Sequence, residues 1–436
     1  MIPGSSESVD AGNGVTGAGA GETTGRYVVV FADEDGEAAH VAALRASGLA
    51  NVASSNDFDA QALDVTQTQD ADGVFFSELG VAVVTAEPSQ LSSLQSSDRG
   101  GILAVEPELV FHVLSQPRGR DYMLGYRDGV TDLCERLAPS GGVDAAAAGT
   151  TSFQDTAQFT WGLQATAVST SSRSGRGVKL AVLDTGFDLN HPDFVGRSIT
   201  AQSFIPGETP QDGHGHGTHC IGTSCGPKTP VGTRRYGIAY DADIFVGKVL
   251  NNQGSGTDTN ILAGINWAVA NRCQVLSMSL GADVRQVSQR YERVGRRALA
   301  AGSLIIAAAG NNAHRSVGDP GFVGIPANSQ SIMAVAAVDE QLAVANFSAR
   351  SNPVRGGQID VAGPGVRVYS SWLMPQRYNR ISGTSMATPH ASGVAALLCE
   401  ATGNVAGQLW STLTQQAQRL PLPSVDVGAG LVQAPQ

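Results

Sequence analysis

The sequence has few features that would tie the chain to a metal cluster, a membrane or a nucleic acid. Its 436 residues include five cysteines, an odd number without a Cys-x-x-Cys pair, so at least one thiol is unpaired and a cysteine zinc site is not expected. No apolar run approaches the roughly 20 residues that span a bilayer. Acidic residues outnumber basic ones, 39 to 28, which argues against binding to nucleic-acid phosphates. We therefore expect neither a membrane nor a nucleic-acid partner.

Charged residues are also scarce, at 15%, whereas 42% of the chain is hydrophobic, so the chain can bury a large core in two or three domains. A basic segment followed by an apolar stretch is missing from the start of the sequence, so no secretory signal is visible and the compartment stays open. Residues 1–25 are rich in Gly, Ser, Thr and Ala with little to bury, and we predict that they are disordered.

Residues 26–114 predict a small α+β domain. The segments YVVVF, EAAHVAALRASG, GVFFSELGVAVVTA, PSQLSSLQSS and ILAVEPELVFHVL indicate a strand, a helix, a strand pair, a helix and a strand, in the order βαββαβ. Residues 115–155 show no sustained periodicity. They are predicted to be an exposed linker that is easily cleaved.

Residues 156–436 predict an α/β domain with a mainly parallel central sheet. Short Val/Ile/Ala strands such as VKLAVLD, DIFVGKVL and SLIIAAAGN alternate with helical stretches, the pattern of a parallel sheet covered on both faces. Ligands of such sheets bind at the carboxyl ends of the strands. Polar residues at strand ends and helix starts are therefore the candidates for a functional site.

Two of these candidates are Asp184 and Ser385. Asp184 ends the strand VKLAVLD and is followed by Thr-Gly, so its carboxylate would emerge at the sheet edge, although a turn aspartate would give the same pattern. Ser385 follows Gly383-Thr384 at the start of a helix whose Pro389 is acceptable only near the first turn. The serine is either a helix N-cap or a nucleophile near free backbone N–H groups, which favour negative charge on a substrate oxygen.

The nonapeptide DGHGHGTHC, residues 212–220, has two interpretations. Asp212, His214, His216 and His219 could bind zinc, but the interleaved glycines make a rigid ligand geometry unfavourable and no second ligand cluster follows. Alternatively, one histidine at a helix start is oriented by Asp184 and removes the proton from Ser385. Neutral imidazole is suited to this role near neutral pH.

Three motifs together resemble the signatures of the subtilisin-like serine proteases, most closely the proteinase K branch. They are AVLDTGFDLNHPDF, DGHGHGTHCIGT and SGTSMATPHASG, in the family order Asp, His, Ser, and the resemblance extends from about Trp161 to the closing GAGLVQ. It implies a subtilisin-like three-layer domain and a serine endopeptidase that needs no cofactor for catalysis. By resemblance the catalytic residues are Asp184, His216, Ser385 and the oxyanion residue Asn311, and Cys220 is an unpaired thiol beneath the base.

The same resemblance implies a site for an extended peptide or protein substrate. Two segments would bind the substrate backbone by strand addition, and a roomy uncharged pocket would favour apolar or aromatic residues before the cut. The backbone segments are Gly254-Ser255-Gly256 and Ser279-Leu280-Gly281, and the pocket residues are Ala308, Ala309, Gly310 and Gly324.

Similarity to proteinase K also suggests a structural calcium ion, held by the carbonyls of Gln330 and Ile332 and the carboxylate of Asp360. An insertion separates these segments, and a plain surface aspartate would look the same. The domain 26–114 resembles an inhibitor-type propeptide, which would act as an intramolecular inhibitor. The position of Trp161-Gly162-Leu163 then points to processing near residue 155. We expect a monomer, and the family is commonly secreted.

Three other functions share parts of this pattern. A metallohydrolase would use the nonapeptide as a ligand set, a catalytically silent relative would act as a binding protein, and a peptide ligase or cyclase would use the same triad with an amine as the acceptor.

Overall fold

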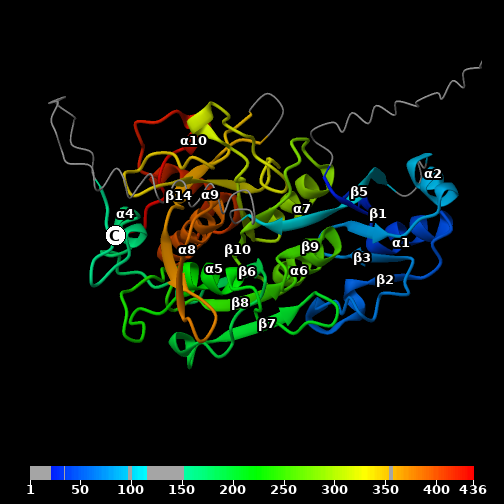
Figure 1. Ribbon diagram of the computed structural model, residues 1–436. Coiled ribbons are helices and arrows are strands. Elements are labelled where there is room, and N and C mark those ends of the chain that lie inside the picture. Colours follow the sequence, from blue (N-terminus) through cyan, green and yellow to red (C-terminus); the bar gives the residue numbers. More distant parts are fainter. Residues whose placement is uncertain (1–20, 34, 97–100, 115–151, 353–356) are drawn as a thin grey trace, which may run out of the picture.

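The structure, a computed structural model, describes residues 21–33, 35–96, 101–114, 152–352 and 357–436, which form a small unit and a large one (Figure 1). The small unit is blue to cyan in Figure 1 and consists of the described residues between 21 and 114. The large unit begins at residue 152 and contains all elements from α4 onward.

The small unit is a twisted sheet with two helices on one face. Its elements are β1 (Thr23–Phe31), α1 (Glu37–Ala46), β2 (Val52–Ser54), the 3₁₀ turns η1 (Ser55–Asp57) and η2 (Asp59–Gln61), β3 (Gly73–Phe76), β4 (Val81–Val84), α2 (Pro88–Ser96) and β5 (Ile102–Val113). The strands lie in the order β5-β1-β4-β3-β2. The alternation along β1 divides its two faces: Val29 and Phe31 pack with Leu44 and Leu94 of the helices, whereas Val28 and Val30 join the core of the large unit.

The predicted βαββαβ order is present, with two differences. The pattern missed β2, which has only three residues and is too short for a clear alternation. In addition, β1 begins at Thr23. The prediction that all of residues 1–25 are disordered is therefore wrong from Thr23 onward. Thr23 pairs with Leu109 of β5, so backbone pairing orders this stretch although its own side chains bury little. Residues 1–20 lie outside the described residues.

A seven-stranded sheet organises the large unit, and its paired strands are all parallel, as predicted. The strand order is β14-β13-β12-β10-β6-β8-β7. The strands are β6 (Lys179–Asp184), β7 (Ile199–Ser203), β8 (Asp243–Lys248), β10 (Val275–Met278), β12 (Leu304–Ala308), β13 (Met333–Val338) and β14 (Val361–Pro364).

Helices cover both faces of this sheet, which gives the three layers. The odd and even positions of β6 show the division: Leu180 and Val182 pack into the cluster that contains α5 (His216–Cys225) and α8 (Thr384–Thr402), whereas Ala181 and Leu183 pack into the cluster with α6 (Asp258–Ala270) and α7 (Gln289–Ala300). The sheet is therefore buried on both sides, as its continuous apolar strands predict.

Shorter elements complete the large unit. They are α4 (Trp161–Ala165), η3 (Pro192–Phe194), β9 (Ser255–Thr257), β11 (Leu280–Gly281), η4 (Arg315–Val317), the hairpin β15 (Val368–Ser371) and β16 (Tyr378–Ile381), α9 (Ala406–Gln416) and α10 (Ser424–Val427). No helix in the described ranges has the length and apolar character needed to cross a bilayer.

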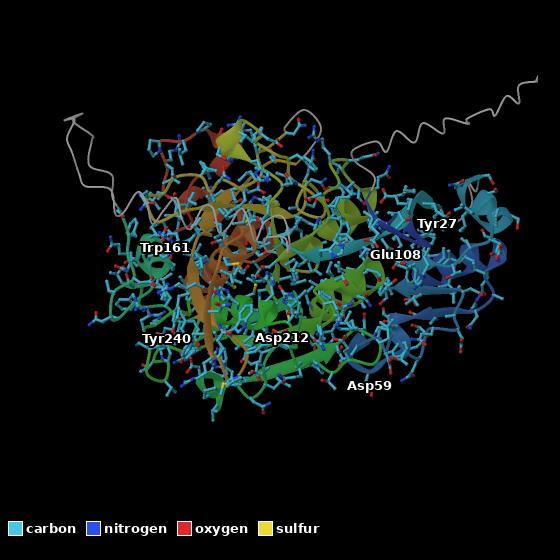
Figure 2. The ribbon with its side chains drawn as sticks, viewed as in Figure 1. Tyr27, Asp59, Glu108, Trp161, Asp212 and Tyr240 are labelled. Atoms are coloured by element: carbon cyan, nitrogen blue, oxygen red, sulfur yellow. The ribbon has the colours of Figure 1, made fainter. Side chains whose placement is uncertain are left out.

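Strand β5 joins the two units. Its first part pairs with β1, and its last part pairs antiparallel with β9 on one side and β11 on the other. Two glutamates of β5 also bind helix starts of the large unit: Glu108, labelled in Figure 2, accepts the Thr259 N–H of α6 (3.0 Å), and Glu106 accepts the Gln289 N–H of α7 (2.8 Å). Free N–H groups at helix starts favour such anionic partners, so these carboxylates fix the small unit onto α6 and α7.

Candidate active site

Asp184 stands at the carboxyl end of β6, where the parallel-sheet rule predicts a ligand site. Its side chain is fully buried, and Oδ1 accepts hydrogen bonds from the Thr185 N–H (2.7 Å) and from Nδ1 of His216 (2.8 Å). The bond to Nδ1 leaves Nε2 of His216 as the ring nitrogen available for proton transfer.

The glycines between the histidines serve the packing of α5. Gly215 precedes the helix with a φ of +101°, and a β-carbon there would lie 2.5 Å from the ring of Trp372. A β-carbon on Gly217 would lie 2.2 Å from the carbonyl oxygen of Gly186. Both positions therefore require glycine if His216 is to approach Asp184.

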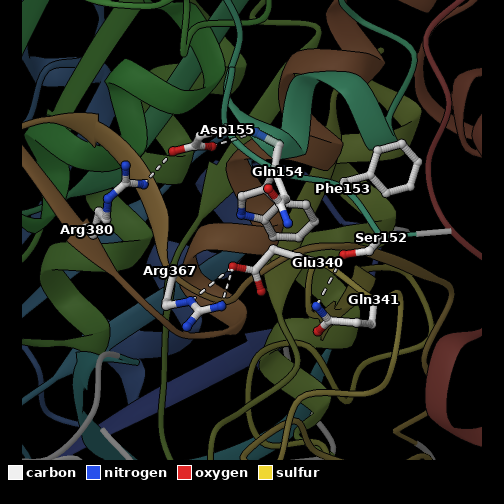
Figure 3. A pocket seen from close by; sticks show the side chains of 9 residues that line it. Ser152, Phe153, Gln154, Asp155, Glu340, Gln341, Arg367 and Arg380 are labelled. Carbon is white, nitrogen blue, oxygen red and sulfur yellow. Dashed lines mark hydrogen bonds and ion pairs between the residues drawn. The ribbon is translucent and has the colours of Figure 1, made fainter. Parts of the chain in front are cut away.

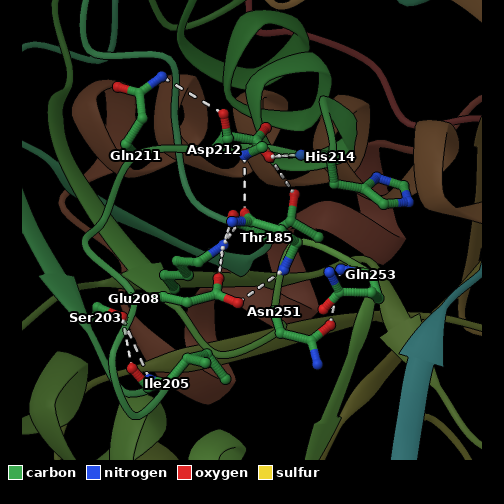
Figure 4. A network of polar contacts seen from close by, with 12 residues as sticks. Thr185, Ser203, Ile205, Glu208, Gln211, Asp212, His214, Asn251 and Gln253 are labelled. Atoms are coloured by element: carbon green, nitrogen blue, oxygen red, sulfur yellow. Dashed lines mark hydrogen bonds and ion pairs between the residues drawn. The ribbon is translucent and has the colours of Figure 1, made fainter.

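Asp212 holds the start of α5 in place. Its Oδ1 accepts the backbone N–H groups of His214 (2.8 Å) and Gly215 (2.9 Å) and the hydroxyl of Thr185 (3.0 Å), and its Oδ2 accepts the N–H (2.9 Å) and hydroxyl (2.7 Å) of Thr218. Figure 4 shows this network around Asp212 and Thr185. Since Thr185 also donates its N–H to Asp184, the network connects the end of β6 to the beginning of α5.

The zinc interpretation of the nonapeptide does not fit this arrangement. The carboxylate of Asp212 is occupied by five donors, and Nε2 of His219 contacts the Val368 carbonyl oxygen (3.0 Å) on another side of the helix. Burial lowers the pKa of His219 to about 3, so this ring is neutral. Within the described ranges, the only set of three or more potential ligand side chains that converge is Asp184, His216 and Cys220.

Cys220 lies beneath the base, as the resemblance implied. Its sulfur is 3.8 Å from Nδ1 of His216, and burial raises the pKa of the thiol, so it is neutral. Burial, the largest single effect, disfavours the charged form of His216, but the interactions with the Asp184 carboxylate and the Cys220 sulfur together outweigh it. The pKa of His216 consequently lies well above its ordinary value of 6.5.

Ser385 is the second residue of α8, and the prediction for Pro389 needs correction. Pro389 lies in the sixth position of a 19-residue helix and not in its first turn. Because proline has no N–H, the carbonyl of Ser385 loses its usual partner four residues on. It accepts the hydroxyl of Ser279 instead (2.8 Å), and the thiol of Cys220 lies 3.6 Å away. The helix therefore continues through the proline because neighbouring side chains satisfy the freed carbonyl.

The hydroxyl of Ser385 faces the end of β5. Its Oγ lies 2.8 Å from the carbonyl oxygen of Leu114 and 3.0 Å from that of Ser279. Nε2 of His216 is buried without a hydrogen-bond partner among the described residues. The acid–base bond of the expected triad is thus formed, whereas the serine is bonded to carbonyl oxygens.

Asn311 follows the end of β12 and binds the same carbonyl. Its side-chain Nδ2 donates to the Leu114 oxygen, and its Oδ1 accepts the N–H (2.9 Å) and hydroxyl (2.8 Å) of Thr384. Thr384 therefore fixes the orientation of the amide with its N–H group toward Leu114. Among the hydrogen bonds of the described residues, the second expected donor, the Ser385 backbone N–H, does not reach this oxygen.

The two backbone segments predicted to hold a peptide flank the last residues of β5. The partners are Val110 with Thr257, Phe111 with Gly256, His112 with Ser255 and Gly281, and Val113 with Leu280. Gly254 accepts the Val113 N–H (2.9 Å), and Ser279 accepts the Leu114 N–H (3.5 Å). Residues 110–114 thus form an extended strand between the two backbone segments that were predicted to bind a substrate. The carbonyl of the last of these residues, Leu114, lies at Ser385.

The structure also places the predicted pocket residues. Ala308, Ala309 and Gly310 immediately precede Asn311, and Gly324 donates its N–H to the Ala309 carbonyl (3.1 Å). The Leu114 side chain lies against Gly281, 3.0 Å from where a β-carbon would stand.

Asp360, directly before β14, accepts the Ala334 N–H (2.8 Å), and burial raises its pKa to about 7. Ile332 is buried and Gln330 is exposed on the segment before β13.

Two residues near the site, Lys248 and Leu114, escaped the sequence patterns. Lys248 ends β8 with its ammonium fully buried, bonded to the Thr185 carbonyl (2.5 Å) and the Asn252 side chain (2.9 Å) and 3.2 Å from Glu208. The sequence pattern that could have indicated Lys248 is a lysine at the end of an apolar strand. This strand end lies beside Asp184. No local sequence pattern indicates that Leu114 reaches the site, because only the register of β5 against β9 and β11 brings it to Ser385.

Comparison with known proteins identifies a family and several relatives that this chain resembles. Residues 175–425 match the subtilase family. The chain is 39% identical over 238 residues to subtilisin E of Bacillus subtilis (strain 168), and the alignment covers 54% of this chain and 59% of that protein. It is 36% identical over 272 residues to subtilisin DY of Bacillus licheniformis, covering 62% of this chain and 94% of that protein. It is 36% identical over 247 residues to thermitase of Thermoactinomyces vulgaris, covering 56% and 83%. The chain thus spans about three fifths of the length of subtilisin E.

The bond between Asp184 and His216 predicts a measurable titration. In a Ser385→Ala protein, His216 should titrate above 6.5 by NMR, and Asp184→Asn should lower its pKa because the stabilising negative charge is lost. Asp241→Asn, which removes an exposed carboxylate paired with Arg176, should leave the His216 titration unchanged. An unaltered pKa in the Asp184→Asn protein would contradict the assignment.

Proposed function

The chain belongs to the subtilase family, and from its site we propose that it is a serine endopeptidase made as a proenzyme. The observation that best supports this proposal is the position of the Leu114 carbonyl. Its oxygen accepts a hydrogen bond from the Asn311 amide and lies 2.8 Å from the Ser385 hydroxyl oxygen. An extended strand that ends at a nucleophile and an oxyanion donor has the arrangement of a bound peptide substrate.

In the proposed reaction, Ser385 Oγ forms a bond to the scissile carbonyl carbon while Nε2 of His216 takes its proton. Asn311 Nδ2 stabilises the negative oxygen of the tetrahedral intermediate. The C–N bond then breaks, and His216 gives the proton to the leaving amine. Water, deprotonated by His216, then forms a bond to the acyl carbon, and His216 returns the proton to Ser385 Oγ as the acyl C–O bond breaks. Asp184 holds the imidazole with Nε2 toward the serine throughout.

Substrate binding follows the pairing of residues 110–113. Gly254, Ser255 and Gly256 on one side, and Ser279, Leu280 and Gly281 on the other, would bind a peptide backbone as a third strand. Ala308, Ala309 and Gly310, with Gly324, would form an uncharged pocket for the residue before the cut. We propose a broad preference for apolar or aromatic side chains there, which the leucine at position 114 supports.

We further propose that residues 23–114 act as the propeptide and that the bond Leu114–Ser115 is cleaved, in place of a bond near residue 155. The Leu114 carbonyl stands at the nucleophile. Asp155, by contrast, is held within the large unit (Figure 3): it accepts the Trp161 N–H (2.7 Å) and pairs with Arg380 (2.6 Å). A peptide bond beside such an anchored residue is a poor substrate, because the cleavage site must extend into the groove.

A calcium ion at Asp360 is compatible with the residues present. Burial raises the pKa of this carboxyl to about 7, and its hydrogen-bond donor is a backbone N–H with no basic side chain within ion-pair distance in the described part of the chain. A hard cation would offset the cost of burying this charge. We propose that Asp360 and the carbonyls of Gln330 and Ile332 hold it, with a purely structural role.

The endopeptidase proposal predicts which residues the reaction needs. A fluorophosphonate probe should add its mass to the processed enzyme and not to a Ser385→Ala protein, and Asn311→Ala should lower kcat by about 10²–10³ with a smaller change in KM. Peptide products should have the masses of hydrolysis, whereas a ligase would yield joined peptides. Loss of the initial rate on adding a chelator, with no labelling by the probe, would overturn the proposal in favour of a metallohydrolase.

The processing proposal predicts a new N-terminus at Ser115. Intact mass and N-terminal sequencing of purified protein should find it in the unmodified chain and not in the Ser385→Ala chain. Leu114→Asp should slow or redirect the cut because a charged side chain enters an uncharged pocket, whereas Asp155→Asn should leave the cut in place. If the Leu114–Ser115 bond stays intact and the processed chain starts near residue 155, processing occurs where the resemblance implied, and this proposal is wrong.

The calcium proposal predicts a chelator-dependent stability. Chelation should lower the Tm of the Ser385→Ala protein, by roughly 2–4 °C for each kcal/mol of binding free energy lost. Asp360→Asn should remove this response, and Asp243→Asn, which changes a carboxylate at another strand start, should retain it. Equal responses of the two variants to chelation would exclude Asp360 as a ligand.

A further inference from the structure

We propose that Lys248 is a positioning residue whose buried ammonium fixes Thr185 and, through it, the catalytic carboxylate of Asp184. The inference rests on the proposed endopeptidase function and deepens it. Lys248 takes no part in the bond-making steps of that mechanism, yet its charged side chain has no exposed surface and stands at the end of the central strand β8. Burying a charge is costly unless it is paired and hydrogen-bonded, so the partners of the ammonium indicate its role.

The ammonium of Lys248 has three partners, which match its three N–H donors. It donates to the Thr185 carbonyl (2.5 Å) and to the side-chain oxygen of Asn252 (2.9 Å), and it forms an ion pair with Glu208 at 3.2 Å. The Glu208 side chain is 23% exposed, so the ion pair lies at the edge of the buried region. The ammonium is therefore held from three sides, and it holds these three segments together in turn.

The partner that leads to the catalytic residues is Thr185. Lys248 stands opposite Asp184 in the pairing of β6 with β8, so its ammonium reaches the residue directly after the acid. The Thr185 N–H donates to Asp184 Oδ1, and its hydroxyl donates to Asp212 and accepts the Gly217 N–H (2.9 Å). With the carbonyl bound by Lys248, every polar group of Thr185 has a partner. The Thr185 N–H is thereby aimed at the carboxylate oxygen that also binds the catalytic imidazole.

The other two partners of Lys248 hold the loop that leads into α5. Glu208 lies on this loop, and the Asn252 oxygen that binds the ammonium also accepts the Gly213 N–H (2.9 Å). In Figure 4, Thr185 and Glu208 lie on neighbouring segments below Asp212. One buried charge thus connects the ends of two adjacent strands to the loop before the helix of the catalytic base. Removing the ammonium would free the Thr185 carbonyl and this loop at the same time.

The test replaces Lys248 by methionine, which has a similar length and no N–H donor. Rates are measured with processed enzyme on peptides with Phe-His-Val-Leu, the sequence of residues 111–114, before the cut, and kcat is expressed per active site that the fluorophosphonate probe labels. Lys248→Met should lower kcat by about tenfold to 10²-fold, since misplacing a catalytic group by roughly 1 Å costs up to about 10². KM should change less, because the turn 251–255 keeps its own backbone hydrogen bonds. Lys248→Arg, which keeps a charge and N–H donors, should recover part of kcat.

A second readout separates positioning from a purely structural role. It is the NMR signal of the His216 Nδ1 proton in full-length Ser385→Ala chains. With Lys248→Met added, this proton should exchange faster with water, because the carboxylate that binds it is held less firmly. The matched control is Lys179→Met, the same change at the opposite end of β6, where the partly buried lysine bonds the Asn271 carbonyl (3.0 Å). This control should leave both kcat and the proton signal unchanged.

An unchanged kcat in the Lys248→Met enzyme would overturn the inference, whatever its Tm, and so would a lower kcat with the proton signal of the unmodified site. If Lys248→Met yields no labelled enzyme, Glu208→Gln takes its place, since this partly exposed position tolerates a neutral acceptor. Its kcat should then fall by a smaller factor, and an unchanged kcat would again overturn the inference. If unmodified enzyme that reacts with the probe hydrolyses none of the peptides in the absence of the probe, the proposed function itself fails.

Discussion

The carboxylate of Asp212 is the interaction on which the geometry of the site depends. Five donors from the loop 214–218 and from Thr185 converge on its two oxygens, and they connect the end of a central strand to the start of a helix. Without this connection Asp184 and His216 would belong to two separate elements that merely lie near one another. With it, the acid and the imidazole are held by one hydrogen-bonded unit.

Much of this arrangement could be predicted from the sequence, because it follows local rules. Asp184 and Asn311 each follow an apolar strand of a parallel sheet, and the carboxyl ends of such strands meet at one edge. The interleaved glycines of the nonapeptide argued against a rigid metal site, and the strand patterns of VKLAVLD and SLIIAAAGN indicated the parallel sheet that is present. The three motifs then identify which of several polar residues belong together.

The rest could not be predicted because it depends on contacts between distant segments. Pro389 was expected in the first turn of its helix. The helix continues through it because the hydroxyl of Ser279, more than a hundred residues earlier, donates a hydrogen bond to the carbonyl that the proline leaves free. Thr384 orients Asn311 through a contact that no spacing encodes. The position of Leu114 depends on the register of β5 between two short strands of the other unit, and register across units has no local sequence signal.

Strand β5 has one further consequence, since a single segment takes part in two structures at once. Its early residues are the edge strand of the small sheet, paired with β1, and its last residues fill the groove between β9 and β11. Residues 110–113 can leave the groove only by giving up their pairs with β9 and β11, and they are continuous with the part of the strand that pairs with β1. Occupation of the groove at Ser385 is therefore linked to the folding equilibrium of the small unit.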